Sequence, residues 1–164
     1  MKVFAMSRLF AKHVAETCAY WHSIISITDP NNELPVFPPN EKRIAVLGQH
    51  FYDIDFSKKM TPLDEFDMKK IYGHGLFTDD QAREIVAFVR RHIDATKLLI
   101  IHCDAGVSRS AGVAGAILKA TTGSDEKIFK DPMFIPNMWV YRKVLNAWHE
   151  EDDHGREDEG DREV

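Results

Sequence analysis

The stretch from residue 97 to residue 120 limits the fold of this 164-residue chain more than any other part of it. It begins with the apolar run KLLII at 97–101, which is typical of a buried strand. It ends with small apolar residues from Ala111 to Ala120, which favour a packed helix. Between them lies HCDAGVSRS at 102–110. The sequence therefore predicts a strand, a tight loop and a helix N-terminus in direct succession.

This loop is suited to binding an anion. Successive backbone N–H groups in a glycine-containing loop point inward, and the first turn of the following helix adds unpaired donors and the positive end of its dipole. Cys103 and Arg109 stand at the two ends of the loop, with five residues between them. A helix N-terminus and an arginine both favour thiolate over thiol, and a guanidinium can donate to two phosphoryl oxygens at once. One loop thus supplies a nucleophile and a phosphate clamp.

The pattern HCxAGxSRS at 102–110 resembles the signature of the cysteine-dependent protein tyrosine phosphatases, in the form found in their dual-specificity branch. The resemblance implies that Cys103 attacks phosphorus and that Ser110 eases the later departure of the thiolate. It also implies that the reaction needs no metal or organic cofactor. The residues implied in phosphate binding are Asp104, Ala105, Gly106, Val107, Ser108 and Arg109.

The family takes its general acid, which later acts as general base, from an aspartate on a mobile loop. The segment FYDID at 51–55 follows a predicted strand and resembles the family's strand-end stretch, so Asp53 is the predicted acid and Asp55 the second choice. Asp53 lies fifty residues before Cys103, farther than is usual in the dual-specificity enzymes. A long excursion at 54–78, of the kind that often forms an active-site lid, explains the difference. The remaining candidates are Asp64, Asp67, Asp79 and Asp80.

Two further residues have a supporting role by the same resemblance. His102 orients the loop from the end of the strand, unless it is only a satisfied core histidine. The pair Pro136-Asn137 resembles the Pro-Asn that precedes a C-terminal helix in dual-specificity enzymes and braces the phosphate loop. Simple capping of that helix by Asn137 is the alternative.

The order of predicted elements indicates an α/β fold with a mostly parallel central sheet and helices on both of its faces. Strands are predicted at 2–5, 23–28, 43–47 and 97–101, and helices at 7–20, 63–72, 78–94, 111–122, 124–130 and from Asn137 to about residue 149. In the first helix, an apolar face is predicted from the spacing of Leu9, Phe10, His13, Val14 and Thr17.

The last fifteen residues, EEDDHGREDEGDREV, hold nine acids and two arginines. They account for the net charge of −5, because residues 1–149 carry 19 basic and 17 acidic side chains. We therefore predict one catalytic domain at 1–149 and an acidic, disordered tail at 150–164. The near-neutral domain also lacks an Arg/Lys-rich stripe, which argues against nucleic acid as a partner.

Composition favours a cytoplasmic protein without metal or membrane contacts. The two cysteines, Cys18 and Cys103, form no cluster at metal-binding spacing. The first ten residues contain no charged leader followed by an apolar run, and no stretch of about 18 apolar residues occurs. A reducing cytoplasm also suits a thiolate nucleophile.

The expected substrate is a phosphoprotein or phosphopeptide carrying phosphotyrosine, with phosphoserine and phosphothreonine left open. Asp104 stands where relatives that act on phosphoinositides tend to have basic residues, and its charge is expected to repel a polyanionic ligand. The alternatives are an RNA 5′-triphosphatase, which shares this loop, and a phosphate-binding module without turnover. An arsenate reductase or sulfur transferase would need further redox cysteines or another loop spacing.

Overall fold

Strands and helices alternate along the chain in the computed structural model, which describes residues 1–57 and 65–160. The elements are β1 (Lys2–Ser7), α1 (Arg8–Thr17), β2 (His22–Thr28), β3 (Arg43–His50), α2 (Glu65–Tyr72), the 3₁₀ turn η1 (Gly73–Gly75), α3 (Asp79–His92), β4 (Leu98–Cys103), α4 (Arg109–Thr122), α5 (Glu126–Phe129) and α6 (Met138–Gly160). The helix predicted at 63–72 corresponds to α2, and its first two positions lie outside the described residues.

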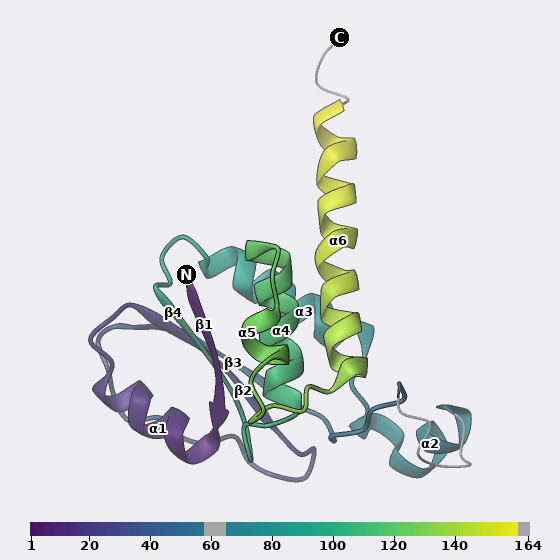
Figure 1. Cartoon of the computed structure of the whole chain (residues 1–164), viewed down its shortest axis with the longest axis horizontal. Helices are drawn as coiled ribbons and strands as arrows, with labels where there is room; N and C mark the ends of the chain where they lie inside the picture. Colours follow the sequence, from purple (N-terminus) through teal and green to yellow (C-terminus); the bar gives the residue numbers. More distant parts are fainter. Residues whose placement is uncertain (58–64, 161–164) are drawn as a thin grey trace.

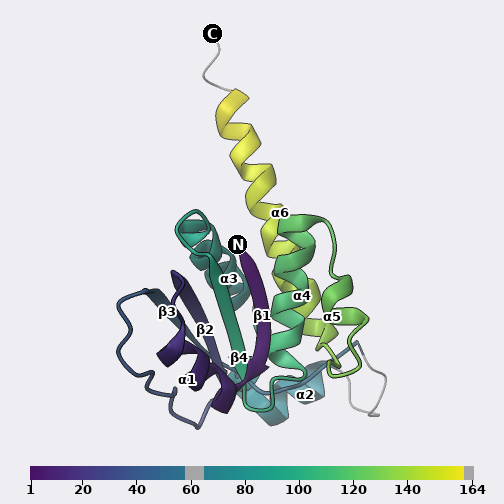
Figure 2. The same cartoon turned by 60° about the vertical axis from the view of Figure 1, so that its left-hand side comes forward.

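The four strands form one sheet in the order β1-β4-β2-β3, and every pair is parallel. Helix α1 lies on one face of the sheet, whereas α3 and α4 lie on the other, with α5 and α6 outside them (Figures 1 and 2). The predicted α/β fold with a parallel central sheet is therefore confirmed. Because all strands run the same way, their carboxyl ends share one edge, and the loop at 102–110 starts at that edge.

The alternation of side chains along β2 and β4 divides the interior into two cores. Ile25 and Ile27 of β2, with Leu99 and Ile101 of β4, face α3, α4 and α6 and belong to the larger core. Ile24 and Ile100 face the opposite way, against α1, and belong to the smaller core. Both strands are thus covered on both faces, which explains the continuous apolar run LLII in β4.

The face that α1 buries differs from the predicted one. Ala11 and Ala15 are its buried residues, whereas Leu9 and Phe10 are 81% and 56% exposed. The small side chains of these alanines allow the helix to lie close to the sheet, over Ile24. The distance between helix and sheet therefore decides which face is buried, and the size of the apolar side chains does not. The helix also ends at Thr17, before the predicted Tyr20.

Helix α6 covers the outer side of α3 and α4 with Val140, Val144, Ala147 and Trp148, all of which are buried. The helix runs to Gly160, past the boundary predicted at residue 149. Glu, which occurs four times in residues 150–160, is a good helix former. The division into a domain at 1–149 and a disordered tail at 150–164 stays a prediction, and residues 161–164 lie outside the described residues.

Candidate active site

The loop between β4 and α4 lies against the end of β1. Gly106 has φ +79°, and a Cβ atom at this position would lie 2.3 Å from the backbone of both Met6 and Ser7. The backbone N–H of Arg8 also donates to the carbonyl of Asp104, at 3.2 Å. Glycine is required at 106 both by the left-handed conformation and by this close approach.

The Cys103 thiol ends β4 and is 3% exposed. Its Sγ accepts a hydrogen bond from the N–H of Gly106 at 3.3 Å and lies 3.2 Å from the hydroxyl oxygen of Ser110, in the first turn of α4. Two groups able to donate hydrogen bonds therefore face the sulfur, and donors of this kind stabilise negative charge on it. The loop thus brings together Cys103, the predicted nucleophile, and Ser110, the residue predicted to ease departure of its thiolate.

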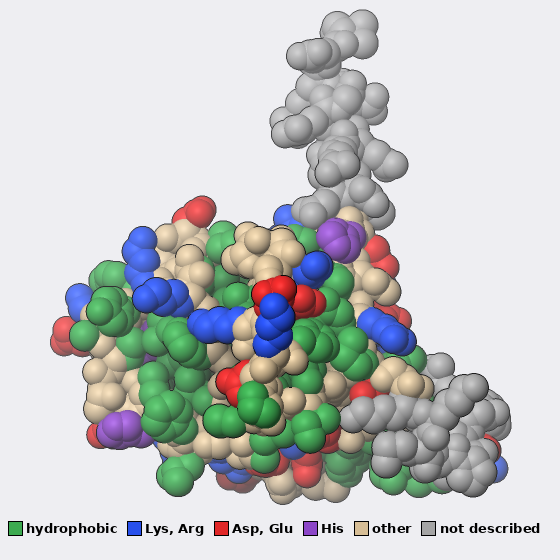
Figure 3. Space-filling model, viewed as in Figure 1, with side chains coloured by type: hydrophobic (Ala, Val, Ile, Leu, Met, Phe, Trp, Pro, Cys, Tyr) green, Lys and Arg blue, Asp and Glu red, His purple; other side chains and the backbone are tan. Residues whose placement is uncertain are grey.

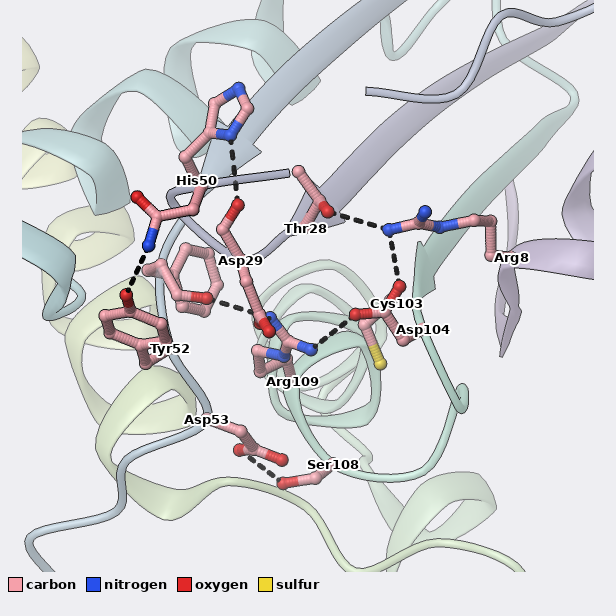
Figure 4. Close-up of polar contacts among 12 residues, drawn as sticks. Arg8, Thr28, Asp29, His50, Tyr52, Asp53, Cys103, Asp104, Ser108 and Arg109 are labelled. Carbon is pink, nitrogen blue, oxygen red and sulfur yellow. Dashed lines mark hydrogen bonds and ion pairs between the residues drawn. The ribbon is translucent and has the colours of Figure 1, made fainter. Parts of the chain in front are cut away.

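The Arg109 guanidinium is held on one side and unpaired on the other (Figure 4). Its Nη1 donates to the carboxylate of Asp29 at 2.6 Å and to the carbonyl of Phe51 at 2.8 Å, and its Nη2 donates to Asp104 at 3.2 Å. Its Nε is buried and has no hydrogen-bond partner in the described part of the chain. Because Nε and Nη2 form one edge of the guanidinium, this edge retains N–H donors suited to two oxygens of a phosphoryl group.

The Asp53 carboxylate is tied directly to the same loop. Its Oδ1 accepts hydrogen bonds from the hydroxyl of Ser108 and from Nδ2 of Asn137, each at 2.8 Å. Ser108 precedes α4 and makes no side-chain cap, because its hydroxyl is directed to Asp53 instead. The backbone N–H of Asn137 also donates to the carbonyl of Ser108 at 3.1 Å. The predicted acid, the loop and the start of α6 therefore form one connected unit.

No protein-family model matches the sequence, and no curated protein matches it significantly. Solved structures do match. Human DUSP28 superposes with a TM-score of 0.57 at 16% identity, over 93% of this chain and 94% of that one. The Yvh1 phosphatase domain from Chaetomium thermophilum gives 0.56 at 14%, over 91% of each chain. PTPMT1 in complex with PI(5)P gives 0.51 at 12%, over 94% of this chain and 92% of that one.

The fold is that of the dual-specificity phosphatases. At these identities the likeness concerns the fold, and it agrees with the resemblance of the motif at 102–110.

In this dual-specificity phosphatase fold, the other candidate acids have different partners. Asp55 accepts backbone hydrogen bonds from Met138 and Trp139, at 3.1 and 3.2 Å, and so occupies the N-terminus of α6. Asp79 pairs with Lys143 at 2.6 Å and Asp80 with Arg83 at 2.7 Å. Asp67 lies on α2, and Asp64 lies outside the described residues. Asp53, in contrast, contacts the loop itself, through the hydroxyl of Ser108.

His102 is fully buried at the end of β4. Its Nε2 lies 2.7 Å from the hydroxyl of Ser26 on β2, and its Nδ1 lies 3.4 Å from the carbonyl of Cys103. Burial lowers the pKa of His102 to about 4. The neutral ring joins β2 to the start of the loop through its contact with Ser26. This contact fits the supporting role predicted for His102.

The side-chain amide of Asn137 makes two kinds of contact. Its Oδ1 accepts from the N–H of Val140 at 3.0 Å, which is a helix cap, while its Nδ2 holds Asp53 and the carbonyl of Ile54 at 3.1 Å. Capping and bracing are therefore one arrangement, since the same amide carries an acceptor and two donors.

Two residues beside the loop, Asp29 and Arg8, were not predicted from the sequence. Asp29 follows β2 directly, and the rule that parallel strands end at one edge of the sheet would have placed it beside the loop that follows β4. Arg8 follows β1, the other neighbour of β4, and is covered by the same rule. Both were overlooked because they belong to no recognised motif.

The expectation that Asp104 repels a polyanion stays a prediction. The structure adds partners that the sequence did not reveal, because Oδ1 of Asp104 contacts the guanidinium of Arg8 and Oδ2 contacts that of Arg109. These contacts reduce the negative charge that a ligand meets at this position.

Among the described residues, no group of three or more His, Cys, Asp or Glu side chains is arranged to hold a metal ion. None of the helices described is both long enough and apolar enough to cross a bilayer.

Proposed function

We propose that the protein is a cysteine-dependent phosphomonoester hydrolase that acts on phosphotyrosine in phosphoproteins or phosphopeptides, and on phosphoserine or phosphothreonine where these reach the loop. One observation carries the proposal: Arg109 keeps a buried Nε–H without a partner among the described residues, in the loop that holds the Cys103 thiol between Gly106 and Ser110. A buried, unpaired donor of a charged group costs stability, which a phosphoryl oxygen would offset.

The first chemical step is in-line attack. The Cys103 thiolate forms an S–P bond while the P–O bond to the leaving group breaks, and Asp53 donates the proton that the leaving oxygen takes up. Arg109 and the loop N–H groups hold the three non-bridging oxygens of the transferring phosphoryl group. Asp53 must be protonated for this step.

The second step is hydrolysis of the phosphocysteine. A water molecule attacks phosphorus, Asp53 takes its proton, and the S–P bond breaks to release inorganic phosphate. Ser110 donates a hydrogen bond to the departing thiolate of Cys103, from its position 3.2 Å away. No external oxidant, metal or cofactor enters either step.

The decisive experiment measures release of p-nitrophenol from its phosphate ester between pH 5 and 8, with EDTA and dithiothreitol present. Cys103→Ser is expected to abolish activity, whereas the matched variant Cys18→Ser, at a half-buried position outside the loop, is expected to behave as the wild type. Full activity in Cys103→Ser would overturn the mechanism. An inactive wild type that still binds phosphotyrosine peptides would support the phosphate-binding module instead.

The RNA 5′-triphosphatase alternative has less support. On the face seen in Figure 3, basic side chains of the described residues are interspersed with acidic and apolar ones and form no continuous stripe. Release of γ-phosphate from a triphosphate-ended RNA at a higher kcat/KM than phosphate from a phosphotyrosine peptide would reverse this preference.

A further inference from the structure

Arg8 lies beside the loop without belonging to it. It is the first residue of α1, and its Nη2 donates to the hydroxyl of Thr28 at 2.7 Å and contacts Oδ1 of Asp104. Asp104 in turn contacts Arg109 through Oδ2 at 3.2 Å. One carboxylate therefore joins two guanidinium groups, one in the phosphate loop and one at its rim (Figure 4).

The Arg8 side chain keeps donors that its contacts do not use. Only Nη2 has partners among the described residues, and Nε is buried without a partner. The side chain is 31% exposed, compared with 7% for Arg109. Arg8 is thus accessible to a ligand at the mouth of the site, whereas Arg109 lies at its base.

The position of Arg8 sets where such a ligand group would lie. Asp104 follows Cys103 directly in the chain, and Figure 4 shows Arg8 and Asp53 on opposite sides of Arg109. A group bound by Arg8 would therefore lie across Arg109 from the predicted acid, at the rim of the site. It would belong to a part of the substrate flanking the phosphorylated side chain.

We propose that Arg8 is a second anion-binding residue, which binds a carboxylate or a second phosphate flanking the phosphorylated residue of the substrate. The proposal rests on the proposed function, because it presumes a phosphate group at Cys103 and Arg109. Asp104 competes with that second anion for Arg8 and thereby limits its affinity. Substrates with an acidic neighbour are preferred over neutral ones.

The test uses three phosphotyrosine peptides that differ at one neighbouring position, which holds Gln, Glu or phosphothreonine. We expect the wild type to prefer the two acidic peptides by about three- to tenfold in kcat/KM, the range of a partly exposed charge-assisted contact. Arg8→Gln is expected to reduce this ratio to about one, and Arg8→Lys to keep part of it. Asp104→Asn is expected to increase it, because the competing carboxylate is gone.

The matched control is Arg83→Gln, which removes an arginine that also pairs with an aspartate, but on α3 and with a half-exposed side chain. It should retain the wild-type ratio. The ratio compares peptides within one variant, so a general loss of folded protein in Arg8→Gln cancels. A preference for phosphothreonine but not Glu would identify a second phosphate as the ligand, and equal preferences would identify any anion.

A wild type that shows no preference, or an Arg8→Gln variant that keeps it, would overturn the inference. If the wild type proves inactive on every substrate, the same ratios are measured as Kd values, with Cys103→Ser as the background. Loss of the binding preference on adding Arg8→Gln would then support the Arg8 site even though the proposed catalytic function had failed.

Discussion

Asp53 and Asp55 are two residues apart, yet the structure gives their carboxylates different surroundings. Asp53 accepts from side chains, Ser108 and Asn137, that link it to the phosphate loop. Asp55 accepts from the first backbone N–H groups of α6, where a carboxylate satisfies unpaired donors and the positive end of the helix dipole. The first arrangement suits proton transfer at the loop, whereas the second suits helix stability.

Exchanging each aspartate for asparagine separates these roles. Asp53→Asn is expected to reduce kcat/KM on a phosphotyrosine peptide by about 10²-fold or more, the usual range for a general acid, and to leave the melting temperature nearly unchanged. Asp55→Asn is expected to lower the free energy of unfolding by about 1 kcal/mol with a much smaller loss of activity. Urea denaturation and steady-state kinetics on both variants provide the check. A larger kinetic loss in Asp55→Asn would reassign the acid.

The buried neutral His102 makes stability depend on pH. Its pKa falls from 6.5 to about 4 on folding, so between these values the unfolded chain binds a proton that the folded protein does not. Stability therefore rises from pH 4 to pH 6.5, by on the order of 3 kcal/mol from this residue, and is retained at higher pH.

Urea titrations at several pH values from 4.5 to 7.5 measure this slope. Replacement of the ring in His102→Asn is expected to lower stability at pH 7.5 and to flatten the slope. His22, also buried and with a lowered pKa, contributes a slope of the same sign in both proteins. An unchanged slope in His102→Asn would contradict the assignment of the effect to this residue.

At the scale of elements, α4 and α6 meet through a glycine. A Cβ atom at Gly112 would lie 2.6 Å from the backbone carbonyl of Asn137, while one at Gly115 would lie 3.4 Å from Phe129 and Tyr141, at the limit of ordinary contact. Since Asn137 also holds Asp53, the spacing between these helices also sets the position of the predicted acid.

The two glycines form a matched pair of test sites on one helix. Gly112→Ala is expected to destabilise the protein by about 1–3 kcal/mol through overpacking, and to lower kcat on a phosphotyrosine peptide by displacing Asn137. Gly115→Ala should be neutral or slightly stabilising, because alanine favours a helix by up to about 1 kcal/mol over glycine. Thermal melts and steady-state kinetics on both variants measure these changes. Equal losses of stability and kcat in the two variants would show that the close approach at Gly112 is unimportant.

The spacing of apolar residues predicted most helices and strands correctly. It predicted the wrong buried face where the residues in contact are not the largest apolar ones. The helix predicted at 78–94 is α3, which Thr78 caps and which buries Ile85, Val86 and Val89. In α1 the predicted face was wrong, because Leu9 and Phe10 are the largest apolar side chains but two alanines make the contact with the sheet. A pattern of apolar residues records hydrophobicity and not the distance between elements.

At the scale of the whole molecule, the site collects residues from the carboxyl ends of all four strands. Arg8 follows β1, Asp29 follows β2, Asp53 comes soon after β3, and Cys103 ends β4. A local motif could identify the loop residues, because they are contiguous in sequence. The partners of Asp104 and Arg109 could not be read in this way, since they depend on the strand order β1-β4-β2-β3, which brings distant segments together.

The proposed mechanism assigns no role to the acidic C-terminal segment. In Figure 1 the distal half of α6 extends away from the sheet and the other helices. Among the side chains of α6 that the structure describes, Ala147 and Trp148 are the last buried ones, and Arg90 donates to the carbonyl of Trp148 at 2.9 Å. Beyond them, Arg83 forms an exposed pair with Glu150, at 3.7 Å, and such pairs contribute little.

Truncation tests whether residues 1–149 suffice. A chain that stops after His149 is expected to keep its melting temperature within about 2 °C and its kcat/KM on p-nitrophenyl phosphate within about twofold, because it keeps every buried side chain of α6 that the structure describes. A chain that stops after Lys143 loses Val144, Ala147 and Trp148 from the large core and should melt at least about 10 °C lower. Calorimetry and kinetics on both truncations distinguish the outcomes. A large loss of stability or activity in the first would mean that residues 150–164 belong to the folded domain and are not a dispensable tail.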